Sequence, residues 1–342
     1  MNRRFRPFSF GVIALLCSEA LYAQSVPEQW FTEKTVPGYL AEIESFQVHY
    51  TGEREWNREF VRWREEIGHP LRIKHLKSKV EFKFFESPEG FLSDEVWKSG
   101  EKITRSEWSN YDNQQWRYYN RYNGVNHLNI STKPIPLAVN GQVLCAQYPP
   151  FFEYLFVAGF PLPRERFEDD IAIYNADLAE IKSVPVWKTA LQRLLKPVEV
   201  TADSDGELCW YLELDGGLSP INEPDTAIYR IWLPFKSPVF AKRIELKHRN
   251  SGEFISVLEV KEFIEVTPKA GKKAFLYPSR WQILSYNCHE TERGFPNQPY
   301  QISNYLLRSV GFNEVDEQIF SQFPEGIRQI NNLDTGKSAN FK

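Results

Sequence analysis

The chain has 342 residues, of which 42% are hydrophobic, 15% aromatic and 25% charged, and it carries 41 Lys plus Arg against 45 Asp plus Glu. Such a composition is typical of a globular protein with one large domain or two modest ones. The slight acidity and the mixed charge exclude the basic face that nucleic acid requires, so we expect no nucleic-acid partner.

The first 23 residues differ from the rest of the chain. Three arginines within the first six residues precede the apolar run "FSFGVIALLC", and Ala23 is a small residue before Gln24. This pattern predicts a secretory signal peptide over 1–23, with cleavage near Ala23 and a periplasmic mature protein. A lipoprotein signal with Cys17 as the lipidated residue fits less well, because Leu16 stands where that processing needs a small side chain.

Three cysteines follow the predicted signal peptide, Cys145, Cys209 and Cys288, and they lie far apart without a CxxC pair. In an oxidising compartment they are compatible with one disulfide and one remaining thiol. Burial as small hydrophobic residues is equally compatible with their spacing.

Two helices and a strand are expected near the N-terminus. Residues 35–46 favour a short amphipathic helix, which leads into a strand over 46–50. Residues 54–66 favour a second helix, whose aromatic face would consist of Trp56, Phe60 and Trp63.

Alternation of apolar and polar residues then predicts most of the fold. Turn residues such as "SPEG", "KSGE" and "NG" separate a first series of strands, and "NSGE" joins two strands of a second series. The first series begins at Val80 and continues at 95–98, 102–108, 114–121 and 127–131, and the second occupies about 208–214, 227–233, 239–249, 253–266, 280–288 and 300–308.

Between the two series, residues 148–196 contain prolines around a strongly apolar core and predict two or three helices that pack on the sheet. We therefore expect a mainly β (α+β) fold, with a large curved antiparallel sheet that forms a half-open β-barrel covered by a few helices. A single domain over 24–325 would contain the helical insertion, and 326–342 would be a solvated tail.

Motifs with familiar chemistry lack the context that they need. "NNLDTGKS" at 331–338 holds one DTG triplet, whereas an aspartic protease needs two, and Asn331 stands at the first glycine position of a phosphate-binding loop. "HETER" at 289–293 has Arg293 in place of the second histidine of a zinc helix. "DSDGE" at 203–207 is better explained as a hairpin turn than as a calcium loop, since Leu212 falls where a bidentate Glu belongs. We expect no catalytic residue, metal or cofactor.

The density of large apolar side chains on many strands suggests a ligand cavity instead. A curved sheet with helices across it would enclose an apolar space suited to acyl chains, although an ordinary filled core would have the same composition. The residues expected to line the cavity are Phe82, Phe84, Trp116, Tyr118, Trp210, Tyr229 and Ile231.

Three stretches resemble the LolA-like superfamily of periplasmic outer-membrane lipoprotein-sorting carriers. "YLAEIESFQVHYTGE" is similar to the opening helix and strand of the family, "IYRIWLPFKSPVFAKRIELKHRNSGEFISVLEV" to its strand, proline-containing bend and long hairpin, and "IFSQFPEGIRQI" to the tail of larger relatives. The resemblance covers about 36–330. It implies a half-open barrel closed by helices, a hydrophobic cavity, and neither cofactor nor catalysis.

The first expectation for function is therefore a non-enzymatic carrier or sensor of a lipid or a lipidated protein. Its partners would be lipoprotein acyl chains and an envelope protein, with peripheral contact to a membrane. The alternative is a carbohydrate or peptidoglycan binding module that uses exposed aromatic residues. A hydrolase without a familiar motif comes third.

Overall fold

In the computed structural model, residues 45–340 are described apart from 72, 74, 88, 113, 123–124, 133–194, 197–198, 204, 216–226, 236–239, 270–273, 288–289 and 292. The predicted signal peptide, the expected helix over 35–46 and nearly all of the helical insertion at 148–196 lie outside the described residues. No described helix is long and apolar enough to cross a membrane.

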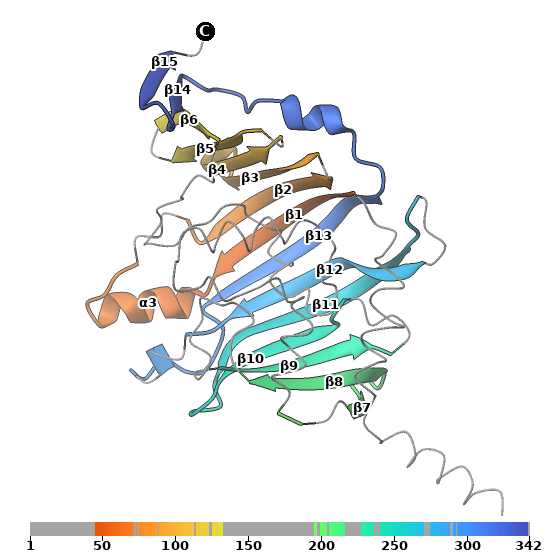
Figure 1. Cartoon of the computed structure of the whole chain (residues 1–342). Helices are drawn as coiled ribbons and strands as arrows, with labels where there is room; N and C mark the ends of the chain where they lie inside the picture. The colour runs from red at the N-terminus through yellow and green to blue at the C-terminus, as the bar shows by residue number, and fades with distance from the viewer. Residues whose placement is uncertain are drawn as a thin grey trace, which may run out of the picture.

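The described strands form one sheet in the order β15-β14-β6-β5-β4-β3-β2-β1-β13-β12-β11-β10-β9-β8-β7 (Figure 1). Its strands are β1 Phe46–Trp56, β2 Lys77–Ser87, β3 Gly90–Ser99, β4 Lys102–Tyr111, β5 Trp116–Tyr122, β6 Val125–Ser131, β7 Glu199–Ala202, β8 Leu208–Asp215, β9 Ala227–Pro234, β10 Arg243–His248, β11 Phe254–Val266, β12 Phe275–Ser285, β13 Gln301–Phe312, β14 Gln329–Asn332 and β15 Lys337–Asn340.

All neighbouring strands of this sheet are antiparallel, except that β14 runs parallel to β6. The sheet is strongly curved and does not close, since β7 and β15 stand at opposite ends of the strand order (Figure 1). The expected mainly β fold with a large, half-open antiparallel sheet is therefore confirmed. The two series of strands are joined by β1, which pairs with β2 on one side and with β13 on the other.

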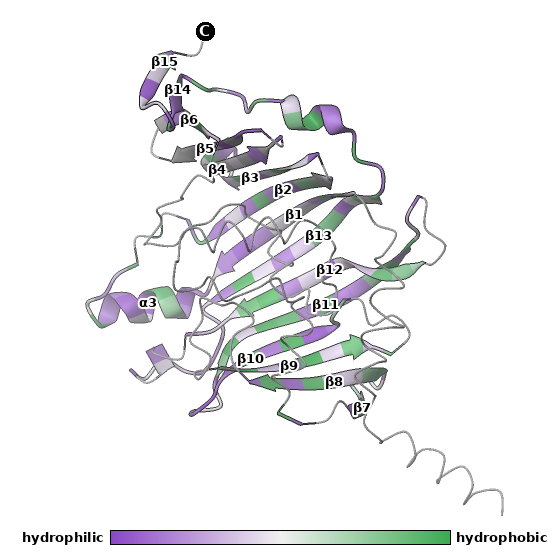
Figure 2. Cartoon of the chain, viewed as in Figure 1, coloured by the Kyte–Doolittle hydropathy of each residue, from purple (hydrophilic) through white to green (hydrophobic). Residues whose placement is uncertain are grey.

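Hydrophilic and hydrophobic residues alternate along many of the strands (Figure 2). Because successive side chains point to opposite faces, the two faces of the sheet differ in chemistry. One face, here called the inner face, carries a continuous cluster of buried apolar residues that runs from β8 and β9 to β2 and β3. The other, the outer face, carries many charged residues, which form ion pairs such as Arg230 with Glu213 and Arg243 with Glu245.

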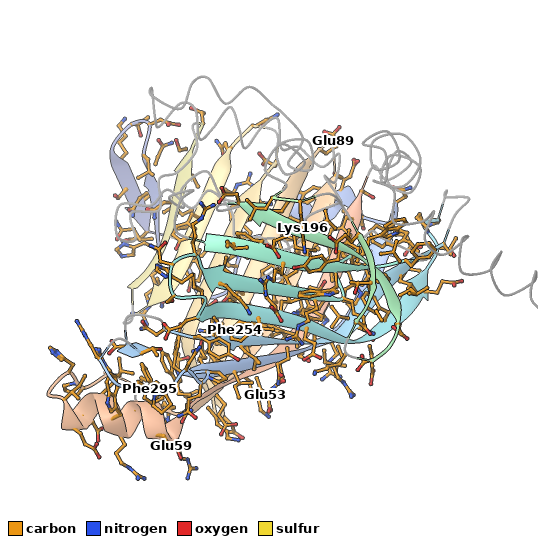
Figure 3. The ribbon with its side chains drawn as sticks, turned by 90° about the horizontal axis from the view of Figure 1, so that it is seen from below. Glu53, Glu59, Glu89, Lys196, Phe254 and Phe295 are labelled. Atoms are coloured by element: carbon orange, nitrogen blue, oxygen red, sulfur yellow. The ribbon has the colours of Figure 1, made fainter. Side chains whose placement is uncertain are left out.

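The helix α3, Arg58–Glu66, is shorter at its start than expected. The side chain of Asn57 accepts hydrogen bonds from the backbone N–H groups of Glu59 and Phe60, so this residue is the N-cap. Trp56 consequently ends β1 and does not share a helical face with Phe60, which corrects the predicted aromatic stripe. Phe60 packs edge-on against Phe295, whose ring centroid is 5.0 Å away, beside the helix (Figure 3).

The C-terminal region does not leave the domain as a solvated tail. After β13 the chain forms the 3-10 helix η4, Glu317–Ser321, whose Phe320 is buried in a second apolar cluster with Ile327, Trp108 and Leu128 on the outer face. Residues 329–332 then pair with β6 as β14. The prediction was wrong because a short polar strand has no apolar alternation that would reveal its pairing.

Candidate functional site

The structure brings five of the seven predicted cavity residues into one cluster on the inner face. Phe82 and Phe84 come from β2, Trp210 from β8, and Tyr229 and Ile231 from β9, and none is more than 6% exposed. Strands that lie at positions far apart in the sheet therefore direct these side chains into a shared apolar region.

The other two predicted residues lie toward the β15 end of the sheet. Tyr118 is half-buried and occupies the same face as Phe84, because Phe84, Ser93, Ser109 and Tyr118 follow one another in register across β2 to β5. Trp116 is the first residue of β5, and its side chain lies outside what the structure describes.

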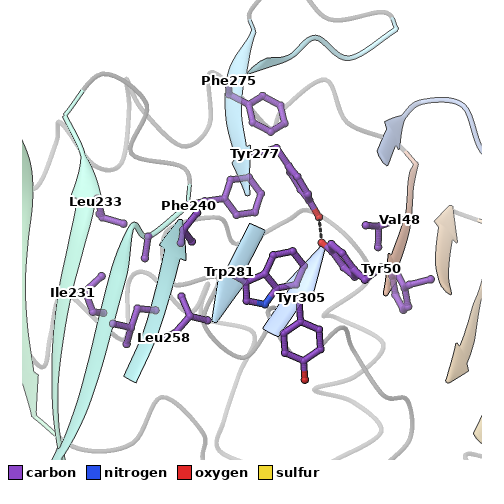
Figure 4. Packing of buried hydrophobic residues seen from close by; sticks show 14 of the residues in the cluster. Val48, Tyr50, Ile231, Leu233, Phe240, Leu258, Phe275, Tyr277, Trp281 and Tyr305 are labelled. Atoms are coloured by element: carbon purple, nitrogen blue, oxygen red, sulfur yellow. Dashed lines mark hydrogen bonds between the residues drawn. The ribbon is translucent and has the colours of Figure 1, made fainter. Parts of the chain in front are cut away.

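Aromatic residues that the sequence analysis did not select dominate the centre of the inner face (Figure 4). The rings of Trp281 and Tyr305 are stacked with centroids 5.3 Å apart, and Tyr50 meets Trp281 edge-on at 4.5 Å. Phe240 lies edge-on to Tyr277 at 4.8 Å. The period-two pattern of Phe275, Tyr277 and Trp281 in β12 was a usable signal for this set.

These ring contacts show whether the described part of the inner face encloses a cavity. Where Tyr50, Tyr277, Trp281 and Phe240 meet, the space inside the curve is filled by the protein's own side chains. A preformed acyl cavity is therefore not visible at this position, and a ligand would have to displace aromatic rings.

Electrostatically, the inner face is divided into an uncharged and a charged part. From β8 to β13 its described positions are apolar or carry uncharged polar residues such as Ser303 and Gln301. On β1 the guanidinium of Arg54 lies 4.0 Å from the ring centroid of Trp97, whose indole N–H donates to the Glu95 carboxylate. The ionic groups therefore begin only at the β1 to β3 region of this face.

The hydroxyl groups of Tyr50 and Tyr277 hydrogen-bond to each other in the middle of the aromatic region (Figure 4). Burial raises the pKa of Tyr50 well above its usual value, with a further contribution from Tyr277. Burial likewise raises the pKa of Tyr277 and of Tyr305. All three phenols are accordingly neutral at physiological pH and retain their protons for hydrogen bonding.

A depression of about 610 Å³ lies on the opposite, outer face. Its lining includes Lys79, Lys98, Arg280, Glu53 and Glu81, and most of these charges are already matched across the strands, as in the 3.8 Å pairs Lys79–Glu53 and Lys98–Glu81. We therefore interpret this region as a solvated, ion-paired surface.

The DTG and DSDGE motifs have structural roles in the fold. Asp334, in the turn after β14, accepts hydrogen bonds from the Ser131 hydroxyl and the Thr132 N–H, so it fixes the end of β6. DSDGE forms the predicted turn between β7 and β8. Its carboxylates Asp203 and Glu207 hold the Lys242 ammonium at 2.5 and 2.6 Å, so a lysine occupies the centre of the loop.

The HETER motif and the cysteines are only partly within the described residues. Glu290 is 5% exposed and forms an ion pair with Arg64 of α3 at 2.5 Å. Cys145, Cys288 and His289 lie outside the described residues. Cys209 is a buried free thiol, and burial raises its pKa to about 11. The described side chains include no group of three or more His, Cys, Asp and Glu placed to hold a metal ion.

Comparison with known proteins adds no functional assignment. No protein-family model matches the chain, and no curated protein matches it at a significant level of sequence similarity.

Proposed function

We propose that this chain is a non-enzymatic carrier or sensor that binds an acyl lipid or a lipidated protein on the inner face of its open sheet. The observation that carries the proposal is the continuous, uncharged cluster of buried apolar side chains on the inner face from β8 to β13, opposite an outer face of ion pairs. Hydrocarbon chains gain free energy from such a surface in proportion to the apolar area removed from water.

The open sheet supplies a route for binding. Because β7 and β15 are the end strands, the curvature of the sheet can change without the loss of a hydrogen-bonded strand pair. Opening separates rings such as Phe240 and Tyr277, and an acyl chain then replaces the contact that these two rings make with one another. As part of the same proposal, the chain is a divergent, larger member of the LolA-like superfamily, exported to the periplasm by its signal peptide.

Two measurements test lipid binding. Protein expressed with its export signal and purified without detergent is examined by native mass spectrometry for retained acyl species. Delipidated protein is then titrated with the fluorescent apolar probe N-phenyl-1-naphthylamine. We expect a stoichiometric adduct in the first measurement and saturable binding in the second, and absence of both results would contradict the proposal.

A matched pair of variants locates the site. Ile231→Phe adds volume on the inner face of β9, whereas Ile228→Phe adds the same side chain on the outer face of that strand. We expect weaker probe binding only for Ile231→Phe, with both variants folded by circular dichroism. Equal effects of the two variants on probe binding would show that the probe does not bind at the inner face of β9.

A carbohydrate or peptidoglycan binding module remains the second candidate, and one observation favours it. Next to Tyr118 in register on the inner face, Asn129 accepts a hydrogen bond from Asn331 at 3.1 Å, and Asn331 also accepts from Ser338 at 2.8 Å. An amide row beside an aromatic ring offers the donors, acceptors and stacking surface that sugars use. Binding on a glycan array that is lost in Tyr118→Ala, without retained lipid, would favour this function.

A further inference from the structure

The Tyr50 and Tyr277 hydroxyls come from strands that are not neighbours. Tyr50 lies on β1 and Tyr277 on β12, and β13 separates these strands in the sheet. Figure 4 shows the two rings directed toward each other above the inner face, with their oxygens joined by the hydrogen bond. The pair thus places two polar groups in the middle of the apolar region.

The surroundings of the pair are aromatic. Tyr50 and Tyr277 are 1% and 0% exposed, respectively. The ring centroids of Tyr50 and Trp281 lie 4.5 Å apart with the rings nearly perpendicular, and the centroids of Phe240 and Phe312 lie 4.8 and 5.9 Å from that of Tyr277. Aromatic rings of this kind provide packing but no oxygen or nitrogen acceptor that could serve a phenol O–H at normal strength.

The two hydroxyl groups together carry one O–H proton more than their mutual hydrogen bond uses. Each phenol hydroxyl has one proton to donate and also accepts hydrogen bonds. A bond between the two hydroxyls uses one of the two protons, whichever tyrosine is the donor. Neither hydroxyl has a second partner within the described residues, so the other proton has no acceptor there. A buried donor without an acceptor is destabilising unless a further group binds to it.

We propose that this remaining O–H is the polar contact of the ligand site and that it donates to the neutral carbonyl oxygen of an acyl ester or acyl amide. This inference rests on the proposed lipid-binding function and specifies its ligand. A neutral carbonyl fits better than a carboxylate, because an anion would enter an apolar cluster in which the neighbouring contacts supply no cation. The raised pKa of both phenols keeps the donor protonated throughout the physiological range.

The pair also makes an unusual prediction about single variants. In Tyr50→Phe or Tyr277→Phe the remaining hydroxyl has lost its tyrosine partner, but it still has one proton to donate. Each single variant should therefore retain the preference for a carbonyl, and only the double variant Tyr50→Phe/Tyr277→Phe should lose it. A pair that served only to link β1 and β12 would show no such pattern in ligand preference.

The experiment uses two competitors of similar length against bound N-phenyl-1-naphthylamine. Methyl laurate carries an ester carbonyl, and tridecane carries no acceptor. From wild type to the double variant, we expect the concentration of methyl laurate needed for half displacement to rise about tenfold, the change expected for one hydrogen bond. The half-displacement concentration of tridecane should show no comparable rise, so the ratio of the two concentrations reports the contact to the carbonyl. Tyr119→Phe, which removes a buried hydroxyl in the outer-face cluster, is the matched control.

A spectroscopic measurement keeps the proposal testable even if the double variant does not fold. Methyl laurate labelled with ¹³C at the carbonyl is bound to wild-type protein, and its carbonyl stretch is compared with that of the ester in hydrocarbon solution. We expect a shift to lower wavenumber in wild type and in both single variants. A bound ester with the hydrocarbon frequency would overturn this inference and leave lipid binding intact, whereas failure of wild type to bind either the probe or the ester would overturn both.

Discussion

The ring of Tyr305 lies directly over the backbone of Gly52, its register partner in the β1–β13 pair. A Cβ atom at position 52 would be 2.7 Å from Cδ1 of Tyr305 and 2.9 Å from the backbone oxygen of Asn304. The ring is also stacked on Trp281, so it cannot move aside freely. Glycine at this position therefore permits the aromatic layer to follow the curvature of the sheet.

We predict that Gly52→Ala destabilises the protein by about 1 to 3 kcal/mol, the usual effect of overpacking. The measurement is equilibrium denaturation in urea. Gly311→Ala on β13 is the control, because there the added Cβ meets the flexible ends of Gln47 and Glu314. An equal loss in the two variants would show that the Tyr305 contact is not the cause.

The ion pair between Arg64 and Glu290 should hold α3 against the turn after β12. Arg64→Met leaves the nearly buried Glu290 without its closest cation, and we expect a loss of roughly 3 kcal/mol. The double variant Arg64→Met/Glu290→Leu should lose less than the sum of its single changes, as a double-mutant cycle by thermal denaturation would show. Arg62→Met, at an exposed position of the same helix, is the control, and a strictly additive cycle would contradict the pairing.

Acid stability should depend on Lys242. Burial alone would raise the pKa of Asp203, but hydrogen bonds from Lys242 and from the backbone N–H groups of Glu207 and Asp205 hold it below its usual 3.8. A carboxyl with a lowered pKa contributes stability above its unfolded pKa, and this contribution is lost as the pH falls below about 3.8.

In Lys242→Met the pKa of Asp203 should rise, because the hydrogen bond and the charge of Lys242 are lost while burial and the two backbone hydrogen bonds remain. The stability that Asp203 contributes at pH 7 is then smaller, so the variant should lose less stability than wild type as the pH falls from 7 to 3. Denaturation curves from pH 3 to pH 7 measure the effect, with Lys269→Met as the control for charge. Parallel pH profiles of wild type and Lys242→Met would contradict the assignment.

Asp334 should stabilise the attachment of β14 to β6. Asp334→Ala removes the acceptor of two hydrogen bonds, from Ser131 and Thr132, and we expect a loss of about 1 to 2 kcal/mol. Amides of residues 329–332 should also exchange with deuterium faster, as hydrogen-exchange mass spectrometry would detect. The exposed Glu325→Ala is the control. Unchanged exchange in β14 would show that Asp334 does not hold this edge.

Sequence patterns predicted the strands well where the alternation was apolar. The runs at Phe82 and Phe84, and at Tyr229 and Ile231, predict strands, and the structure confirms these strands as parts of β2 and β9. The predicted helical position of Trp56 is wrong, since a strand followed by the cap Asn57 produces the same short aromatic spacing as a helical stripe. The proposed ligand site could be predicted only in part, because Tyr50 and Tyr277 are ordinary aromatic positions in the sequence until β1 and β12 are placed near each other.

Consecutive residues specify the local elements and the two faces of each strand, because alternation with period two is a local property. The pairing of the strands follows only from the folded structure. It placed β1 beside β13, with Phe46 opposite Phe312, and it added Gln329–Asn332 to the edge of β6. Many strands with the same apolar–polar alternation could pair with a different neighbour, and their own sequence pattern would be unchanged. The choice therefore depends on packing between distant residues, such as the ring of Tyr305 over Gly52 and the hydroxyl pair of Tyr50 and Tyr277.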